Sequence, residues 1–399
     1  MRAVLVACVA VATVTAAVGQ TTRPAETAAP LQFVQVIADG DDGVQINDHV
    51  GAVAARGEFV YAGIVYRGSL KYFRRDAATG RLTYAGELAF EDKVLSIGNL
   101  LWAGGRLYFN AGIGHWSNDS QSRGLWWLNV DARTGKPTIG GSIPTPISSR
   151  LFAGPDGKGL YLFLRDKRTL VRYALAADGK PTPAQEVVLK EAGGKIVDVQ
   201  MAPDGRGVWV MSGGRDYRLN GVEIKADGTL GETRGPWPLA ELTAGVEWPE
   251  GKWGYGWGCG FQLSPDGRHL YAHHYNYGAK VCRMALYVRD SQTGRIAFKQ
   301  RIEDRTGLEM VRIQGMAWAD GGRIGHYVSG GESPGNVVGW CTRDVQTGVL
   351  TFGGTVRQTK GAGPHTICLD PASGALYAGG WRRHCLYVLK TAPATSGKR

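Results

Sequence analysis

The chain has 399 residues, of which 43% are hydrophobic and 20% are charged, so it can bury a large core. Its formal net charge is +11, but the basic residues are scattered rather than gathered in one stripe. This distribution argues against a nucleic-acid-binding protein and is typical of a basic, soluble surface. The 59 glycines and 12 tryptophans, with little helical periodicity, predict many short strands joined by tight turns.

The N-terminal segment 1–19 is predicted to be a signal peptide that is removed on export. A positive charge at Arg2 precedes an uncharged apolar run over 3–18, and a small-x-small cleavage motif ends at Gly19. An uncleaved membrane anchor is the alternative, although the run is slightly short for a full span. Residues 20–30 are predicted to be a flexible linker. We therefore expect a periplasmic or extracellular protein with no stable membrane span after cleavage.

Two short patterns recur along residues 31–390. The first is a tight turn, often Pro-Asp-Gly, followed by an aromatic residue in the next strand. Proline presets φ in such a turn, aspartate bonds to its own backbone, and glycine accepts a positive φ. The aromatic residues at this position are Tyr61, Tyr108, Tyr161, Trp209, Tyr271, Tyr327 and Tyr377.

The second pattern is Asp-x-x-Thr-Gly after an aromatic strand. It ends at Gly80, Gly135, Gly294 and Gly348, with shortened forms at Gly179 and Gly228. The mean spacing of these glycines is about 54 residues, in the range of propeller blades. Because one such unit cannot bury both of its faces alone, the units must stack. The sequence therefore predicts an all-β fold, a seven-bladed β-propeller in one domain.

The ring is predicted to be closed by an N-terminal strand. The seventh unit lacks a fourth strand after residues 385–389, whereas Leu31–Ile37 alternates in polarity and has no partner in its own unit. Placing this strand in the last blade closes the ring and covers the free sheet edges. Residues 391–399 are predicted to be a disordered tail.

Five cysteines remain after signal removal, all in the C-terminal third of the chain. An exported protein can form disulfides, and an odd number leaves at least one thiol unpaired or paired between chains. The alternative is that they are small buried hydrophobic residues within strands. Both interpretations stay open, and no pairing is assigned. The cysteines are Cys259, Cys282, Cys341, Cys368 and Cys385.

The repeats resemble a known family. The segments 72–84, 287–298 and 341–352 each join an aromatic strand to an Asp-x-x-Thr-Gly turn, and they are similar to the repeats of lactonase-like propellers. Ser264–Tyr271 and Gly361–His365 are similar as well. This family includes bacterial phosphogluconolactonases and YVTN-type surface proteins. The resemblance covers most of the mature chain and implies the seven-bladed fold, while the reaction is not specified by turn and core signatures.

One rim of the propeller is predicted to carry the functional site. Loops that join the second and third strands of a blade, or one blade to the next, are long and irregular, whereas the other connections are tight turns. Unusual loops on a rigid scaffold are where binding normally occurs. Aromatic side chains suit sugars, and arginine suits carboxylates or phosphates. The predicted ligand-binding residues are Tyr66, Arg67, His115, Trp116, Arg215, Tyr217, Trp253, Trp257, His273, His274, Tyr275, Arg382, Arg383 and His384.

Catalytic residues are not identified by any trusted motif. If the protein is a lactone hydrolase, base and oxyanion-stabilising roles would come from His365, His274, Glu332 and Arg382. The arginine that lactonase-like proteins often carry between the proline and the histidine of this segment is absent before His365, which favours binding over hydrolysis. The sequence has no Gly-x-Ser-x-Gly motif.

No metal or cofactor is expected. His273 and His274 are adjacent, and on a strand they point to opposite faces, which prevents joint chelation. The segment 39–43 resembles half of a calcium loop but lacks the later glutamate. A Cys-x-x-Cys-His haem motif and a phosphate-binding glycine loop before a helix are both missing from the sequence.

The sequence thus predicts an exported, monomeric binding or interaction scaffold. Its loop-bearing rim would hold a small molecule, a carbohydrate or a protein, and no nucleic acid. A lactone or sugar-lactone hydrolase using the same rim is the main alternative, and it rests on the family resemblance. A third possibility is a subunit-interaction platform within a periplasmic complex.

Overall fold

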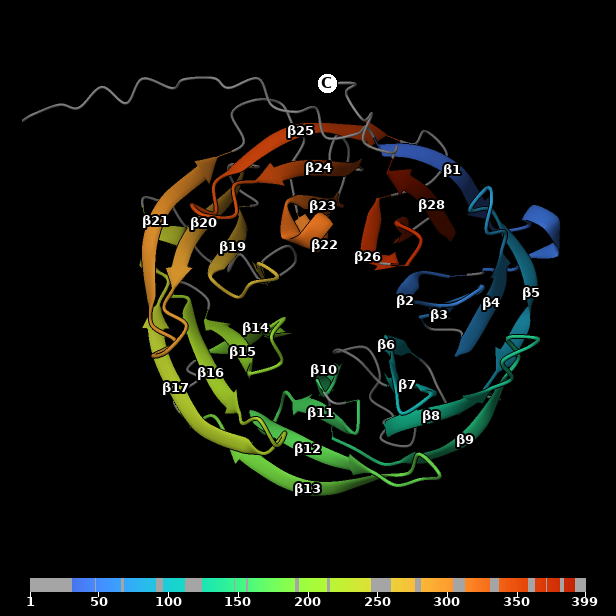
Figure 1. The fold of residues 1–399 in the computed structure, drawn as a ribbon, viewed down its shortest axis with the longest axis horizontal. Coiled ribbons are helices and arrows are strands. Elements are labelled where there is room, and N and C mark those ends of the chain that lie inside the picture. The colour runs from blue at the N-terminus through green and yellow to red at the C-terminus, as the bar shows by residue number, and fades with distance from the viewer. Residues whose placement is uncertain are drawn as a thin grey trace, which may run out of the picture.

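The computed structural model describes residues 31–46, 48–65, 68–90, 96–111, 124–146, 148–155, 157–190, 194–213, 216–244, 260–276, 281–303, 313–330, 337–357, 363–370, 372–380 and 384–391. Within them, seven four-stranded antiparallel sheets stand around a common axis (Figure 1). The predicted seven-bladed β-propeller is confirmed. The predicted signal peptide, linker and most of the predicted tail lie outside the described residues.

Each blade runs from an inner strand beside the axis to an outer strand at the circumference (Figure 1). Blade 1 consists of β2 (Val50–Arg56), β3 (Phe59–Ile64), β4 (Ser69–Arg75) and β5 (Leu82–Ala89). Blade 2 consists of β6 (Ile97–Ala103), β7 (Arg106–Ala111), β8 (Gly124–Val130) and β9 (Pro137–Ile143). Blade 3 consists of β10 (Ser148–Ala153), β11 (Gly159–Leu164), β12 (Thr169–Leu175) and β13 (Pro181–Val188). Blade 4 consists of β14 (Lys195–Met201), β15 (Gly207–Gly213), β16 (Arg218–Ile224) and β17 (Leu230–Pro238). Blade 5 consists of β18 (Gly260–Leu263), β19 (His269–Asn276), β20 (Val281–Arg289) and β21 (Ile296–Glu303). Blade 6 consists of β22 (Ile313–Ala319), β23 (Ile324–Ser329), β24 (Val337–Arg343) and β25 (Leu350–Arg357).

Blade 7 combines strands from both ends of the propeller. It consists of β26 (Pro364–Asp370), β27 (Ala375–Gly380), β28 (Cys385–Thr391) and, outermost, β1 (Leu31–Ala38). β1 pairs antiparallel with β28 from Leu31 opposite Thr391 to Ala38 opposite Cys385, as Figure 1 shows. The predicted closure by an N-terminal strand is therefore confirmed.

Helical structure in the described chain is limited to short connections. The 3-10 turns are η1 (Asp41–Gly43) and η3 (Asp320–Gly322), and the α-helix α1 (Ala240–Thr243) follows the outer strand of blade 4. None of the described helices has the length and apolar character that would let it cross a membrane.

The two sequence patterns meet in space and hold neighbouring blades together. In four blades the tyrosine hydroxyl of the first pattern donates a hydrogen bond to the glycine carbonyl of the second pattern in the next blade, at 2.6–2.9 Å. In each full Asp-x-x-Thr-Gly turn, the aspartate side chain accepts a hydrogen bond from the threonine backbone N–H of the same turn, and this bond fixes the conformation of the turn. The four pairs are Tyr61 with Gly135, Tyr108 with Gly179, Tyr161 with Gly228, and Tyr271 with Gly348.

Ion pairs between blades reinforce the same rim. Arg343 of blade 6 donates to Asp266 in the first turn of blade 5, and Arg75 of blade 1 donates to Asp370 of blade 7. The Arg343 side chain is fully buried. Burial alone would raise the pKa of Asp266, but hydrogen bonds from Ser264, the Arg268 backbone and Arg343 outweigh it and hold that pKa well below its ordinary value.

The core consists of apolar clusters between adjacent blades, and some polar side chains are buried with them, His326 among them. His326 on β23 is only 1% exposed. It directly precedes Tyr327, the aromatic residue of the first sequence pattern, and the other blades have valine or leucine at this position. Neither ring nitrogen of His326 has a hydrogen-bond partner. Burial lowers the pKa of His326 to about 4, so the imidazole is neutral in the core.

The described cysteines support the interpretation as buried core residues. Cys282 and Cys341 lie in the apolar cluster between blades 5 and 6, and Cys385 lies in the next cluster. The four described cysteines form no disulfide with one another. Burial raises the pKa of the Cys341 thiol to about 12, so this side chain is unreactive. Cys259 lies outside the described residues.

Candidate functional site

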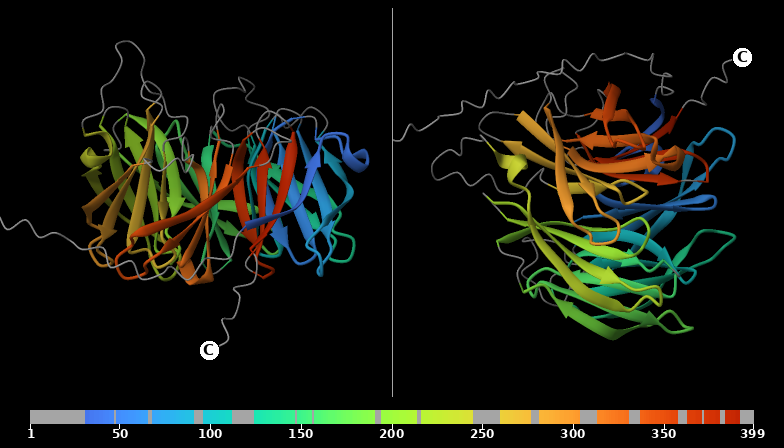
Figure 2. Two further views of the ribbon diagram at one scale, coloured as in Figure 1. Left: turned by 90° about the horizontal axis from the view of Figure 1, so that it is seen from above. Right: turned by 60° about the vertical axis from the view of Figure 1, so that its left-hand side comes forward.

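The antiparallel topology separates the two rims of the ring. Turns between the first and second strands, and between the third and fourth, lie on what we call the turn rim. The other connections, and the strand ends that join them, lie on what we call the loop face. Figure 2 shows the ring edge-on, with the rims at opposite ends of the strands. Two groups of polar side chains occur near the loop face in the described residues.

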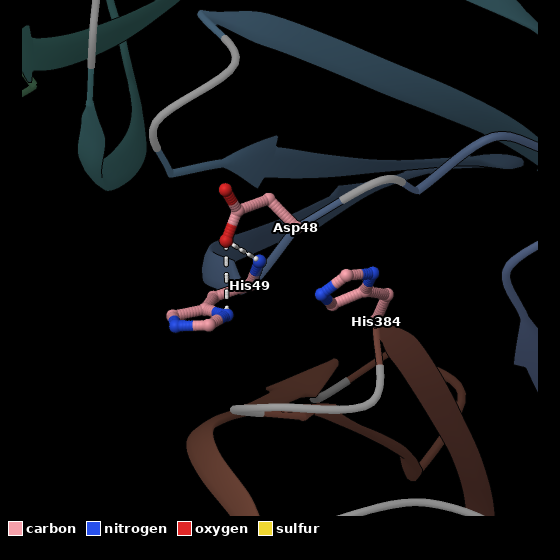
Figure 3. A group of neighbouring side chains, drawn as sticks. All are labelled: Asp48, His49 and His384. Atoms are coloured by element: carbon pink, nitrogen blue, oxygen red, sulfur yellow. Dashed lines mark hydrogen bonds and ion pairs between the residues drawn. The ribbon is translucent and has the colours of Figure 1, made fainter.

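The first is the junction group, Asp48, His49 and His384. Asp48 and His49 lie between η1 and β2, and His384 directly precedes β28, so the group joins blades 1 and 7 (Figure 3). Asp48 Oδ1 lies 3.0 Å from His49 Nδ1 and accepts a 2.7 Å hydrogen bond from the His49 backbone N–H. One nitrogen or oxygen atom from each of the three side chains lies within 4.8 Å of the other two.

The junction group exists because the ring closes at this place. β1 lies against β28 in blade 7, and the chain then passes through η1 into the inner strand of blade 1. The segment that carries Asp48 and His49 is therefore placed beside the chain that enters β28, more than 300 residues later in the sequence. The two imidazole centroids are 6.2 Å apart. His384 has a φ of 47°, an uncommon backbone conformation that histidine adopts more readily than most residues.

The second is what we call the inner-strand group: Arg150 and Asp198 on inner strands, and His273 on β19, which pairs with the inner strand β18. Arg150 is on β10, Asp198 on β14 and His273 on β19, so blades 3, 4 and 5 each contribute one residue. Arg150 Nη2 lies 3.6 Å from Asp198 Oδ1, with side-chain exposures of 40% and 12%. Asp198 Oδ2 also accepts hydrogen bonds from the Phe261 backbone N–H at 3.2 Å and from Gln200 at 3.1 Å.

Gly260 provides the space in which this group assembles. A Cβ atom built on Gly260 would lie 2.9 Å from Asp198 Oδ2 and 3.2 Å from His273 Nε2. The first distance is shorter than real Cβ contacts allow, so any larger residue would displace the carboxylate. Asp198 thus pairs with Arg150 of blade 3 and faces the buried His273 of blade 5 across the space at Gly260, where the inner strand of blade 5 begins.

Strand bulges shape this end of the inner strands. Six of the seven inner strands shift register near their first residues, on β2, β6, β10, β14, β22 and β26. A bulge re-aims a side chain and is common beside functional sites. His365, a predicted candidate, is the bulged residue of β26 between Pro364 and Thr366, and it is half-buried. It is not a member of the junction group.

The other described candidates lie within the blades. Tyr217 and His274 are buried, and the tyrosine hydroxyl lies 3.0 Å from His274 Nδ1 across blades 4 and 5. Burial, followed by the nearby His273 and Arg283, lowers the pKa of His274 to about 4. Tyr275 packs in the cluster between blades 5 and 6. Of the described candidates, His273 and His384 belong to the two polar groups.

Ten predicted site residues lie outside the described residues, and their roles stay predictions. They are Tyr66, Arg67, His115, Trp116, Arg215, Trp253, Trp257, Glu332, Arg382 and Arg383.

Sequence reasoning missed Asp48, His49, Arg150 and Asp198. Arg150 and Asp198 occur within strand segments rather than loops, so a search of irregular loops passes over them. The position of Asp48 and His49 near the loops of blade 7 could have been predicted from the sequence. Once the N-terminal strand is placed in blade 7, the segment that follows it must lie beside the loops of that blade.

The structure is similar to several solved propellers. It matches a candidate 6-phosphogluconolactonase from Bacteroides uniformis with a TM-score of 0.57 and 15% identity, covering 75% of this chain and 83% of that one. It matches the Pseudomonas aeruginosa periplasmic gluconolactonase with a TM-score of 0.51 and 16% identity, covering 77% and 84%. The chain has the lactonase-like seven-bladed propeller fold.

The fold is not restricted to lactonases. Kuenenia stuttgartiensis hydrazine synthase matches with a TM-score of 0.61 and 16% identity, covering 88% of this chain and 99% of that one. Neither a known family profile nor a curated protein sequence matches the chain. At these identities the likeness establishes the fold, and function must be argued from the site.

Proposed function

We propose that the protein is an exported, lactonase-type propeller that binds a small anionic, hydroxylated ligand at the inner-strand group. The observation that carries this proposal is the meeting of Arg150, Asp198 and His273 from three consecutive blades. Arg150 offers forked N–H donors that suit a carboxylate or phosphate. Asp198 accepts hydrogen bonds, as from ligand hydroxyl groups, and His273 can donate or accept. A small sugar acid combines the groups that such a set recognises.

Rigid placement supports the binding role. The three residues are on strands of separate blades, so their spacing is set by the packed ring rather than by a loop. Two further donors, the Phe261 backbone N–H and the Gln200 amide, fix the orientation of Asp198. Preorganised groups lose less conformational entropy when a ligand binds.

Binding can be tested with gluconate and 6-phosphogluconate as probes in isothermal titration calorimetry. We expect saturable binding by the wild type, and at least a 10-fold weaker affinity for Arg150→Ala and for Gly260→Ala, whose methyl group displaces the carboxylate. Arg133→Ala is the matched control, because Arg133 is an exposed arginine of a turn-rim turn. Equal affinities for wild type and Arg150→Ala, or no binding of either probe, would contradict the proposal.

Lactone hydrolysis is the second candidate function, and the same three side chains favour it. A lactone opens when water attacks its carbonyl carbon, and this requires a base for the water proton and a donor for the developing oxyanion. His273 Nε2 would accept that proton, and Arg150 would stabilise the oxyanion. His273 then returns the proton to the ring oxygen as the carbon–oxygen bond breaks, giving the hydroxy acid.

Turnover against a panel of sugar lactones separates the two functions. If the protein is a hydrolase, we expect His273→Ala to lower kcat/KM by about 100-fold or more, the usual contribution of general-base catalysis. His365→Ala tests the base proposed from sequence. Turnover by the wild type no faster than the uncatalysed reaction would rule out hydrolysis and leave the binding role in place.

Export is part of the proposal. It is supported by the apolar run over residues 3–18, and a periplasmic gluconolactonase has the same fold. N-terminal sequencing of protein from fractionated cells should give Gln20 as the first residue. An intact N-terminus on cytoplasmic protein would contradict export.

A further inference from the structure

We propose that the junction group, Asp48, His49 and His384, binds a divalent first-row transition-metal ion, with zinc as the expected occupant. The group shares no residue with the inner-strand group, so the inference does not depend on the proposed function. It rests on the identity, spacing and partial burial of three side chains that the closed ring brings together (Figure 3).

The donor set selects the class of metal. Two imidazoles and one carboxylate are typical ligands of zinc, cobalt, nickel, copper and non-haem iron. Calcium and magnesium prefer oxygen ligands, so two histidines disfavour them. Three protein ligands leave at least one coordination position for water or for a ligand, as in catalytic rather than structural zinc sites.

The spacing is close to that of a metal site. Bonds of about 2.0–2.1 Å place the ligand atoms of a tetrahedral zinc ion roughly 3.4 Å apart. The Asp48 Oδ1 to His49 Nδ1 distance is already 3.0 Å, and all three ligand atoms lie within 4.8 Å of one another. Closing the remaining gap requires rotation of these half-buried side chains about their χ angles. The His49 backbone N–H holds Asp48 in place through its 2.7 Å hydrogen bond.

Local backbone geometry removes the objection that applies to adjacent histidines on a strand. His273 and His274 both lie on β19, and their side chains alternate. Asp48 and His49 precede β2 in irregular backbone, and their side chains are close enough to contact each other, as a dashed line in Figure 3 marks. The sequence led us to expect no metal, because these three residues become neighbours only when β1 completes blade 7.

Metal binding is measured on tag-free protein that has been stripped with a chelator. Zinc is titrated by calorimetry, and cobalt is titrated by its visible d–d absorption, which reports a protein ligand field. We expect one ion per chain with a Kd of about 10 µM or tighter. Affinity should fall as the pH is lowered toward 5, since the imidazoles must be deprotonated to bind.

Variants identify the ligands. His384→Asn and His49→Gln should each weaken zinc binding by at least about 100-fold, and asparagine at position 384 tolerates the positive φ. His326→Leu is the matched control, because it removes a histidine that is buried in the core. Circular dichroism confirms that each variant is folded. Stoichiometric binding that survives in His384→Asn, or that is lost in His273→Ala instead, would overturn the proposal, as would the absence of binding by the wild type.

Discussion

The turn rim and the loop face belong to the same blades, but contacts repeat from blade to blade on the turn rim and differ between blades on the loop face. On the turn rim the same contact is repeated from blade to blade, a tyrosine hydroxyl bonded to the glycine carbonyl of the next blade. On the loop face the two polar groups occur once each and differ in composition. Repetition thus marks the parts that every blade needs for packing, and chemistry occurs where the repeat is broken.

A cleft on the turn rim shows that shape alone does not mark the site. A cavity of about 290 Å³ lies between blades 7 and 1, lined by Val34, Arg75, Ser373 and neighbouring residues. The guanidinium of Arg75 is already paired with Asp370 and hydrogen-bonded to Ser373. This cleft therefore belongs to the inter-blade contacts rather than to a ligand site.

The largest expected effect tests the structural role of the turn rim. Arg343→Ala should lower the free energy of unfolding by about 2–3 kcal/mol, because it removes the charge-assisted hydrogen bond of a fully buried arginine, while the partly exposed Asp266 keeps its bonds from Ser264 and Arg268. Urea denaturation at pH 7 measures it, with Arg133→Ala as the exposed control. A loss below about 1 kcal/mol, the value of a surface pair, would mean that the turn rim does not hold the blades together.

The same pair has a defined pH dependence. The pKa of Asp266 in the folded protein lies below its ordinary value of 3.8. Its contribution to stability is therefore present above about pH 4 and is lost as the pH falls below that value through the folded pKa. Arg343→Ala should weaken this acid dependence.

The second effect concerns the core between the rims. The pKa of His326 is lowered to about 4 in the folded protein, from an ordinary value of 6.5. Stability should be constant above pH 6.5 and should decrease as the pH falls from 6.5 to about 4, since only the unfolded state binds the proton there. His326→Leu should remove about 2 kcal/mol of this loss at pH 5.

His274, whose pKa is lowered in the same way, accounts for a further part of the loss. Urea denaturation of both proteins at pH 7.5 and pH 5 gives the comparison. Parallel losses in wild type and His326→Leu would show that His326 is protonated normally in the fold.

The third effect is smaller and tests one inter-blade contact. Tyr271→Phe removes the 2.7 Å hydrogen bond to the Gly348 carbonyl without changing the packed ring. We expect a loss of about 1 kcal/mol in the free energy of unfolding, the usual value for one buried hydrogen bond. Trp209, which packs against Gly294 in the equivalent place of blade 4, offers a natural comparison. No measurable change would mean that packing alone defines this contact.

The smallest stability effect is expected on the loop face. Arg150→Ala and His384→Asn should change the free energy of unfolding by less than about 0.5 kcal/mol, since neither side chain is part of the apolar core. Their effects should appear in ligand and metal binding instead. A stability loss comparable to that of Arg343→Ala would show that the loop face is structural as well.

Much of the fold was predictable because its determinants are local. Asp-x-x-Thr-Gly and Pro-Asp-Gly define tight turns within a few residues, and their spacing reveals the blades. Alternation in Leu31–Ile37, with no local partner, was sufficient to predict the closing strand. The sequence also indicated that the loop face differs from the turn rim, because its connections are irregular.

The tertiary structure decided which side chains meet. Histidine is a residue type that is common in functional sites, and His274 was predicted as a site residue for that reason. In the structure, β19 directs its side chain into the interface between two blades, where it contacts Tyr217. Arg150, Asp198 and His273 come from three blades, and nothing in their local sequence links them. Their proximity depends on strand register and ring curvature, which are set by packing over the whole chain.

The sequence by itself determined the repeating blade, its turns and the strand that closes the ring, because each depends on contacts within one unit or on one unmatched strand. Only the tertiary structure placed Asp48 and His49 beside His384. That neighbourhood arises when the first strand completes the last blade, so it is a property of the closed ring and of no single repeat.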